Sequence, residues 1–114
     1  MFDFQKLNVY HKAQDSVKDI ADLLADKQLD RVISNQLKRA SLSIVLNIAE
    51  GSSRFSNKDR RNFLVIARGS AFECVAVMEY LLKNKFITEE IYNHFFRQLE
   101  EISKMLYALI KKLE

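Results

Sequence analysis

The basic side chains in the middle of the chain are the residues with the clearest potential for binding chemistry. Between Arg31 and Arg68 the sequence has eight basic and two acidic residues, against a formal net charge of +3 for the whole chain. Arginine and lysine contact phosphates, and an exposed aromatic ring stacks on an unpaired base. Because Phe55 and Phe63 are interleaved with these cations, the segment is the best candidate for a nucleic-acid contact. The candidate residues are Arg54, Lys58, Arg60 and Arg61, followed by Lys38 and Arg39.

The same segment has a second interpretation, in which it is a solvated loop and helix start with both phenylalanines packed inward. Basic residues at the N-terminus of a helix oppose the helix macrodipole, so their charge does not serve helix stability. A patch this small binds weakly in a single chain, whereas its repetition around an oligomer multiplies the interaction. Both interpretations stay open from the sequence.

Charged and polar residues also fall close to the apolar faces of two predicted helices. On the helix predicted over residues 56–85, Arg61, Arg68 and Glu79 lie along the middle of the apolar face. A charge in that position must be paired or must open into a polar cavity. We expect Arg68 to pair with Glu50 or Glu79 and to fix the helix register, and the alternative is a ligand or partner site. The polar cluster considered for either role comprises Gln36, Ser43, Asn47, Glu50, Arg68, Glu73 and Glu79.

The residue types needed for catalysis or metal binding are few and scattered. His11, His94 and Cys74 lie on three different predicted helices, and no two of them have the i, i+4 or CxxC spacing of metal ligands. There is no phosphate-binding glycine loop and no GxSxG or HExxH motif. We therefore expect no catalytic residue, no metal site and no cofactor, and a protein that is not an enzyme.

Cysteine content and hydropathy indicate the compartment. The single cysteine, Cys74, cannot form an internal disulfide and fits a reducing environment. The first residues lack the apolar core of a signal peptide, and no stretch approaches the roughly 18–20 apolar residues of a membrane span. We therefore expect a cytoplasmic protein without a membrane contact.

Composition and spacing predict a single all-α domain over residues 1–114. Apolar residues make up 48% of the chain, proline is absent and only two glycines occur, so a few long helices are favoured over a fold rich in turns. Four segments with helical periodicity and short connections indicate an antiparallel up-down four-helix bundle. The predicted helices are Asn8–Ala25, a second from Asp30 to Glu50, a third from Ser56 to about Lys85, and a fourth from Thr88 nearly to Glu114.

Cap preferences and the two glycines mark the predicted helix ends. Gly51 follows the second helix, where a residue in the left-handed conformation is favoured. Gly69 lies inside the third helix at a cost of up to about 1 kcal/mol relative to alanine, and the expected reason is close approach by another helix or subunit. The candidate N-caps are Asn8, Asp30, Ser56 and Thr88.

An apolar surface remains on the side of the second and third helices away from the core. Because the helical period is 100° per residue, this surface lies roughly opposite the core stripe of the second helix and continues on the back of the third. Neighbouring helices of the same chain are one possible cover, and a second copy of the chain is the other. We expect self-association, with an interface formed by Leu42, Leu46, Ala49, Ile66, Val77 and Tyr80.

Longer runs of sequence carry a family resemblance. One run contains Asn47-Ile48-Ala49-Glu50-Gly51, and another contains Ala67-Arg68-Gly69-Ser70 followed by Glu73. The opening Phe4-Gln5-Lys6-Leu7-Asn8-Val9-Tyr10 extends the similarity over nearly the whole chain. In these segments the sequence resembles the bacterial four helix bundle protein family, also called the 23S rRNA intervening-sequence-encoded or S23 ribosomal-type family.

The resemblance implies a four-helix bundle that assembles into a homopentameric ring. It also implies kinship with the accessory variability proteins of diversity-generating retroelements, which are basic pentamers that bind reverse transcriptase and nucleic acid. Two functions are therefore expected. The first is a non-enzymatic homo-oligomer that binds RNA or DNA through symmetric basic patches, and the second is a protein-interaction scaffold without a nucleic-acid role.

Overall fold

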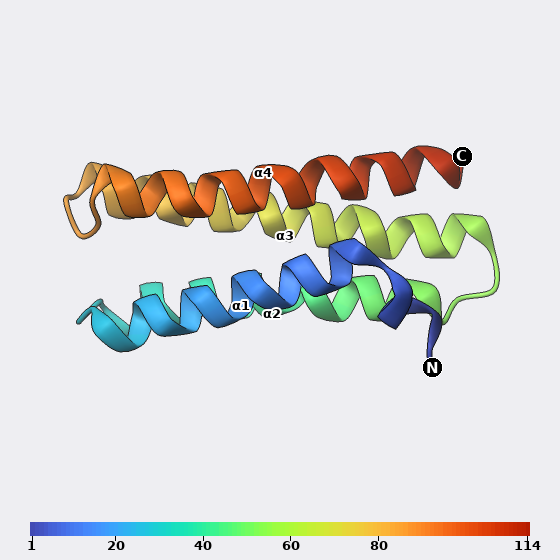
Figure 1. Cartoon of the computed structure of the whole chain (residues 1–114), viewed down its shortest axis with the longest axis horizontal. Coiled ribbons are helices and arrows are strands. Elements are labelled where there is room, and N and C mark those ends of the chain that lie inside the picture. Colours follow the sequence, from blue (N-terminus) through green and yellow to red (C-terminus); the bar gives the residue numbers. More distant parts are fainter.

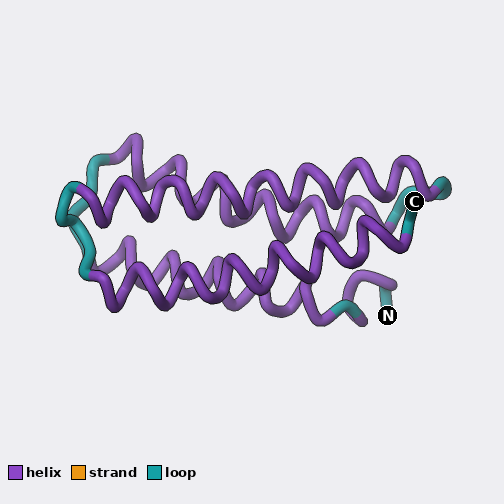
Figure 2. The backbone as a smooth tube through the Cα atoms, turned by 90° about the horizontal axis from the view of Figure 1, so that it is seen from above, coloured by secondary structure: helices purple, strands orange, loops and turns teal.

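The computed structural model covers residues 1–114 and consists of helices joined by short loops, with no strand (Figure 1). It confirms the prediction of an all-helical chain with four long α-helices. The helices lie side by side along the 44 Å axis of the molecule, and the chain reverses direction at each connecting loop (Figures 1 and 2). The elements are the 3-10 helix η1 (Asp3–Lys6) and the α-helices α1 (Asn8–Asp26), α2 (Arg31–Ser52), α3 (Asn57–Lys83) and α4 (Glu89–Lys112).

Side-chain caps determine where three of the four α-helices begin. Asp30 accepts a hydrogen bond from a first-turn amide of α2 at 2.7 Å, Ser56 caps α3 at 3.1 Å, and Thr88 caps α4 at 3.2 Å. These contacts satisfy amides that have no partner within the helix. The same prediction is wrong for Asn8, which is the first residue of α1, while Leu7 takes the cap position without a side-chain hydrogen bond.

Gly51 does not end α2 in a left-handed conformation, contrary to expectation. The helix continues to Ser52, and the backbone of Gly51 keeps a negative φ. A Cβ atom at Gly51 would lie 3.1 Å from the Cβ of Phe63 and 3.3 Å from the carbonyl oxygen of Arg60. Glycine therefore permits the start of α3 to approach the end of α2 closely. The left-handed residue is Lys85, in the loop after α3, with φ 63°.

The hydrophobic core runs along the bundle and takes one face of every α-helix. α3 packs against α2 and α4, and α1 lies against the same two helices. Burying one large aliphatic side chain stabilises the fold by about 1.5–3 kcal/mol, so a core of this size accounts for most of the favourable free energy. No helix is both long and apolar enough to cross a membrane. The largest fully buried aliphatic residues are Ile20, Leu37, Ile44, Ile48, Met78, Leu81, Leu99, Ile102 and Leu106.

Candidate functional site

The loop between α2 and α3 lies at the same end of the bundle as both chain termini (Figure 1). Phe55, in this loop, is 100% exposed, and the neighbouring Lys58 is also exposed. The interpretation in which both phenylalanines pack inward is therefore wrong for Phe55, while Phe63 is half-buried. We call this part of the molecule the basic end, and its cations are Lys6, Arg54, Lys58, Arg60, Arg61, Lys111 and Lys112.

Three of the candidate arginines at the basic end also hold the local structure together. Arg54 forms an ion pair with Glu50 at 2.5 Å and lies over the ring of Phe63, 4.6 Å from its centroid. Arg60 donates from Nε to the carbonyl oxygen of Arg54 at 2.6 Å, and Arg61 donates from Nη1 to that of Leu113 at 3.1 Å. A carbonyl oxygen does not neutralise a guanidinium, so Arg60 has no internal counter-charge. Arg61 also interacts with the Glu114 carboxylate, whose pKa is lowered by Lys111 and, to a smaller extent, by Arg61.

Lys112 is a cation of the basic end that sequence reasoning missed. A cleft of about 270 Å³ lies between the N-terminal segment and the ends of α2, α3 and α4, with Arg60 and Lys112 among its lining residues. Its apolar lining includes Leu7, Leu64 and Leu109. Lys112 follows Arg60 by about fifty positions in sequence, so only the bundle topology brings the two cations together.

Lys38 and Arg39, the two secondary nucleic-acid candidates, lie apart from the basic end. Both side chains are exposed on α2. At a rise of 1.5 Å per residue, Arg39 is roughly 20 Å from the end of α2 at Ser52. The structure therefore does not bring these residues into one patch with Lys58 within a single chain.

The polar cluster divides between the two sides of α3. On the α2 side, the side-chain amide of Gln36 donates to the Glu73 carboxylate, and the Ser43 and Ser70 hydroxyls lie 2.8 Å apart. Asn47 donates to the backbone oxygen of Ser43 at 2.8 Å. The first two contacts connect α2 to α3, the third lies within α2, and together they support a structural role for this half of the cluster.

Arg68, on the α4 side of α3, does not form the ion pair expected for it. Glu50 pairs with Arg54 instead, and no ion pair joins Arg68 to Glu79. The guanidinium carbon of Arg68 lies 4.7 Å from the ring centroid of Phe72 and 5.5 Å from that of Tyr107. The expectation of an internal pair is wrong because the guanidinium lies against two aromatic rings, while Glu79 and Glu100, which line the same groove between α3 and α4, form no ion pair with it.

The apolar surface predicted on the backs of α2 and α3 meets solvent within the single chain. Leu42, Leu46, Ile66 and Tyr80 are 47%, 56%, 51% and 49% exposed, while Ala49 and Val77 are half-buried. No neighbouring helix of the same chain covers the four exposed residues. This result contradicts the interpretation in which the bundle itself shields them.

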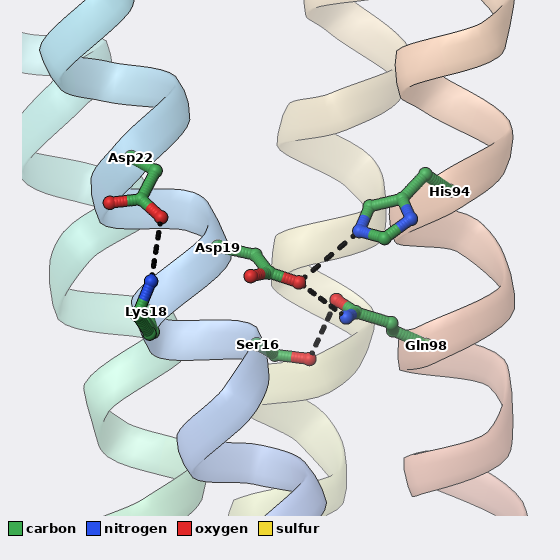
Figure 3. A network of polar contacts seen from close by, with 6 residues as sticks. All are labelled: Ser16, Lys18, Asp19, Asp22, His94 and Gln98. Carbon is green, nitrogen blue, oxygen red and sulfur yellow. Dashed lines mark hydrogen bonds and ion pairs between the residues drawn. The ribbon is translucent and has the colours of Figure 1, made fainter.

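A polar network joins α1 to α4 (Figure 3). Gln98 donates to Asp19 at 2.7 Å and accepts a hydrogen bond from the buried hydroxyl of Ser16 at 3.0 Å. His94 Nε2 lies 3.2 Å from the same carboxylate of Asp19. His94 therefore takes part in an interhelical contact that holds α4 against α1.

His11 and Cys74 also have local structural environments. His11 Nε2 lies 2.7 Å from the backbone oxygen of Gln5, which ties α1 to η1. Burial, with a further contribution from the carboxylate of Glu73, raises the pKa of the Cys74 thiol to about 12. A thiol held in its protonated form is a poor nucleophile and a poor metal ligand.

These features define a small helical-bundle protein with a basic end and an exposed apolar surface. The chain belongs to the 23S rRNA-intervening sequence protein family, which it matches over residues 5–108. It is also similar to a protein of unknown function from the S23 ribosomal protein family of Bacteroides thetaiotaomicron, whose crystal structure was determined at 1.70 Å resolution. The two are 33% identical with a TM-score of 0.85, over 90% of this chain and 98% of that one. No curated protein matches the chain.

Proposed function

We propose that the protein is a non-enzymatic cytoplasmic homo-oligomer, an up-down bundle assembled into a ring, that binds RNA or another nucleic acid through its basic end. The observation that carries this proposal is the fully exposed ring of Phe55 beside the exposed cation Lys58. An aromatic side chain in water at the tip of a basic loop has no folding role, and it matches the stacking platforms of single-strand binding proteins.

The charges around Phe55 support an anionic ligand. Lys58 has no ion pair, and Arg60 and Arg61 donate only to backbone carbonyl oxygens. The cleft beside Arg60 and Lys112 has a partly apolar lining, which suits an unstacked base whose phosphate contacts the two cations. One such end makes few phosphate contacts, so the proposal includes symmetric repetition of the basic end in an oligomer.

The exposed surface of α2 and α3 supports the oligomeric part of the proposal. Four large apolar side chains at about half exposure form the kind of patch that soluble chains cover by association. The family resemblance implies five subunits and kinship with the accessory proteins of diversity-generating retroelements. A ring of five would place five copies of Phe55 and its cations on one molecule.

Binding of a fluorescein-labelled single-stranded RNA, followed by anisotropy over a range of salt concentrations, tests the nucleic-acid part. The logarithm of affinity should fall linearly with the logarithm of salt concentration, and Lys58→Ala should reduce that slope by about 0.7 for each phosphate contact removed. Phe55→Ala should weaken binding by about 1–3 kcal/mol at an unchanged slope, because stacking involves no counterion release.

Two variants at the opposite end of the bundle serve as matched controls. Phe86→Ala removes a ring that is 45% exposed in the α3–α4 loop, and Lys83→Ala removes an exposed cation at the end of α3. Both should bind RNA like the unmodified protein. Absent binding, salt-independent binding, or equal losses at both ends of the bundle would each contradict the proposal.

A protein-interaction scaffold without a nucleic-acid role is the second candidate function. The observation that favours it is the same exposed apolar surface of α2 and α3, which a partner protein covers as well as a second copy does. Affinity purification after nuclease treatment distinguishes the two functions. Recovery of one protein in stoichiometric amount, together with absent RNA binding, would favour the scaffold.

A further inference from the structure

A groove between α3 and α4 holds a guanidinium without a charged partner. The groove encloses about 400 Å³, and we call it the Arg68 groove. Its lining includes Phe72, Val75 and Phe96, and Phe72 is 55% exposed. The Nε atom of Arg68 is buried and has no hydrogen-bond partner. A buried donor without a partner costs free energy, so this side chain is incompletely satisfied in the single chain.

The carboxylates near Arg68 interact with other groups. Glu100 lies 3.8 Å from the amine of Lys104. Partial burial, together with the charge and hydrogen bond of Glu79, raises the pKa of Tyr92, which places Glu79 beside that phenol. Two aromatic rings stack on the guanidinium of Arg68 and leave its fork of donors available to a carboxylate from outside the chain.

The apolar surface on the other side of α3 carries the complementary charge. Glu73 is exposed and shares a shallow depression with Val77 and Tyr80. It is the only charged residue among those that line this depression. Its hydrogen-bond partner is the neutral amide of Gln36, and no cation of the same chain forms an ion pair with it.

The positions of Arg68 and Glu73 on α3 suit contact between two copies. They are five positions apart in the sequence, which places them about 140° apart around the helix axis. Two complementary sites on different sides of one subunit produce a head-to-tail contact, not a two-fold dimer, and such a contact forms a ring where its rotation closes. The guanidinium of Arg68 lies against Phe72, the residue next to Glu73, so the two charges are within about one helical turn in height.

We infer that the Arg68 groove receives the α2–α3 surface of a second copy, with Glu73 of the partner subunit paired to Arg68. This inference rests on the self-association in the proposed function and names its two faces. The apolar side chains around Glu73 then cover Phe72 and Phe96, and the ion pair fixes which surfaces meet. Every subunit contributes one groove and one surface, so the same contact repeats around the ring.

Charge reversal with light scattering after size-exclusion chromatography tests the pairing. Arg68→Glu and Glu73→Arg should each weaken association at least about 30-fold, because each leaves like charges facing one another across the contact. The double variant R68E/E73R restores opposite charges and should recover the mass of the unmodified protein. Arg97→Glu, which reverses an exposed charge on α4, is the control and should leave the mass unchanged.

A mixture of the two single variants separates contact between chains from contact within one chain. The glutamate at position 68 of one variant meets the arginine at position 73 of the other, so the mixture should form a species heavier than either variant alone. Circular dichroism establishes that each variant is folded. Glu73→Arg alters an exposed side chain and removes only its hydrogen bond from Gln36, so it reports on the contact even if Arg68→Glu does not fold.

The outcomes distinguish this inference from the proposed function. If the unmodified protein associates but single charge reversals leave its mass unchanged, or the double variant fails to recover it, the pairing is wrong and self-association stands. If the unmodified protein is a monomer, both are overturned. Loss in each single variant with recovery in the double variant and in the mixture supports the pairing.

Discussion

Gly51 and Gly69 both lie within helices, but their surroundings differ in a way that stability measurements can detect. A Cβ atom at Gly69 would meet nothing within 4 Å, whereas at Gly51 it would press on Phe63 and on the backbone of Arg60. Glycine in a helix interior costs up to about 1 kcal/mol relative to alanine. Gly69→Ala should therefore raise the free energy of unfolding by about 1 kcal/mol.

Gly51→Ala is the matched comparison, because the same gain in helix propensity is offset there by the tight contact with α3. Urea unfolding of both variants at one protein concentration measures the difference, since association changes apparent stability. A loss of stability in Gly69→Ala would contradict the open surroundings of this residue. It would instead indicate that a partner subunit approaches α3 at Gly69.

Which side chains contact one another was the feature least predictable from the sequence. The spacing correctly indicated that Arg68 lies beside apolar residues, but the expected pair with Glu50 or Glu79 is wrong. Helical periodicity gives the side of a helix on which a residue lies and says little about which neighbour a long side chain reaches. For Phe55, the sequence left both inward packing and exposure open, and the structure shows the ring to be fully exposed.

At the scale of the helices, the N-caps allow a direct comparison. Thr88 accepts a hydrogen bond from the amide of Ile91 at 3.2 Å, whereas Asn8 caps nothing. Thr88→Ala should lower the free energy of unfolding by about 1 kcal/mol. Asn8→Ala should leave it unchanged or raise it by a few tenths of a kcal/mol, because alanine is the better helix former. Thermal or urea unfolding followed by circular dichroism measures both.

Equal destabilisation by Thr88→Ala and Asn8→Ala would contradict the cap assignments.

Helix bounds were largely predictable, because a capping residue precedes α2, α3 and α4 and the apolar period of each helix is clear. The end of α2 was less predictable, because a glycine such as Gly51 commonly ends a helix. Here glycine is needed for the close contact with α3, a tertiary constraint that no local pattern reveals.

At the scale of the whole molecule, topology assembles features that lie far apart in the sequence. The reversal of direction at each loop brings the end of α4 to the α2–α3 loop, so Lys112 and Arg60 line one cleft (Figure 2). It also leaves Lys38 and Arg39 away from the basic end. The sequence indicated the central basic segment, but which cations share one surface depends on how the helices are arranged.

The exposed apolar surface of α2 and α3 also matters at the scale of the whole molecule. The sequence predicted that Leu42, Leu46, Ile66 and Tyr80 lie away from the core, and in the single chain all four are about half exposed. The proposed ring gives this surface a cover, gives Arg68 a carboxylate and gathers weak basic ends into one binding site. All three depend on association of the chain with itself.

The absolute mass of the unmodified protein in solution, measured by light scattering at low and high salt, tests this dependence most directly. We expect a stable species near five times the subunit mass of 13.3 kDa at both salt concentrations, because apolar burial is the main contribution to the contact. A species of 13.3 kDa at all protein concentrations would contradict self-association. The pairing of Glu73 with Arg68 and the repeated basic ends would then have no support.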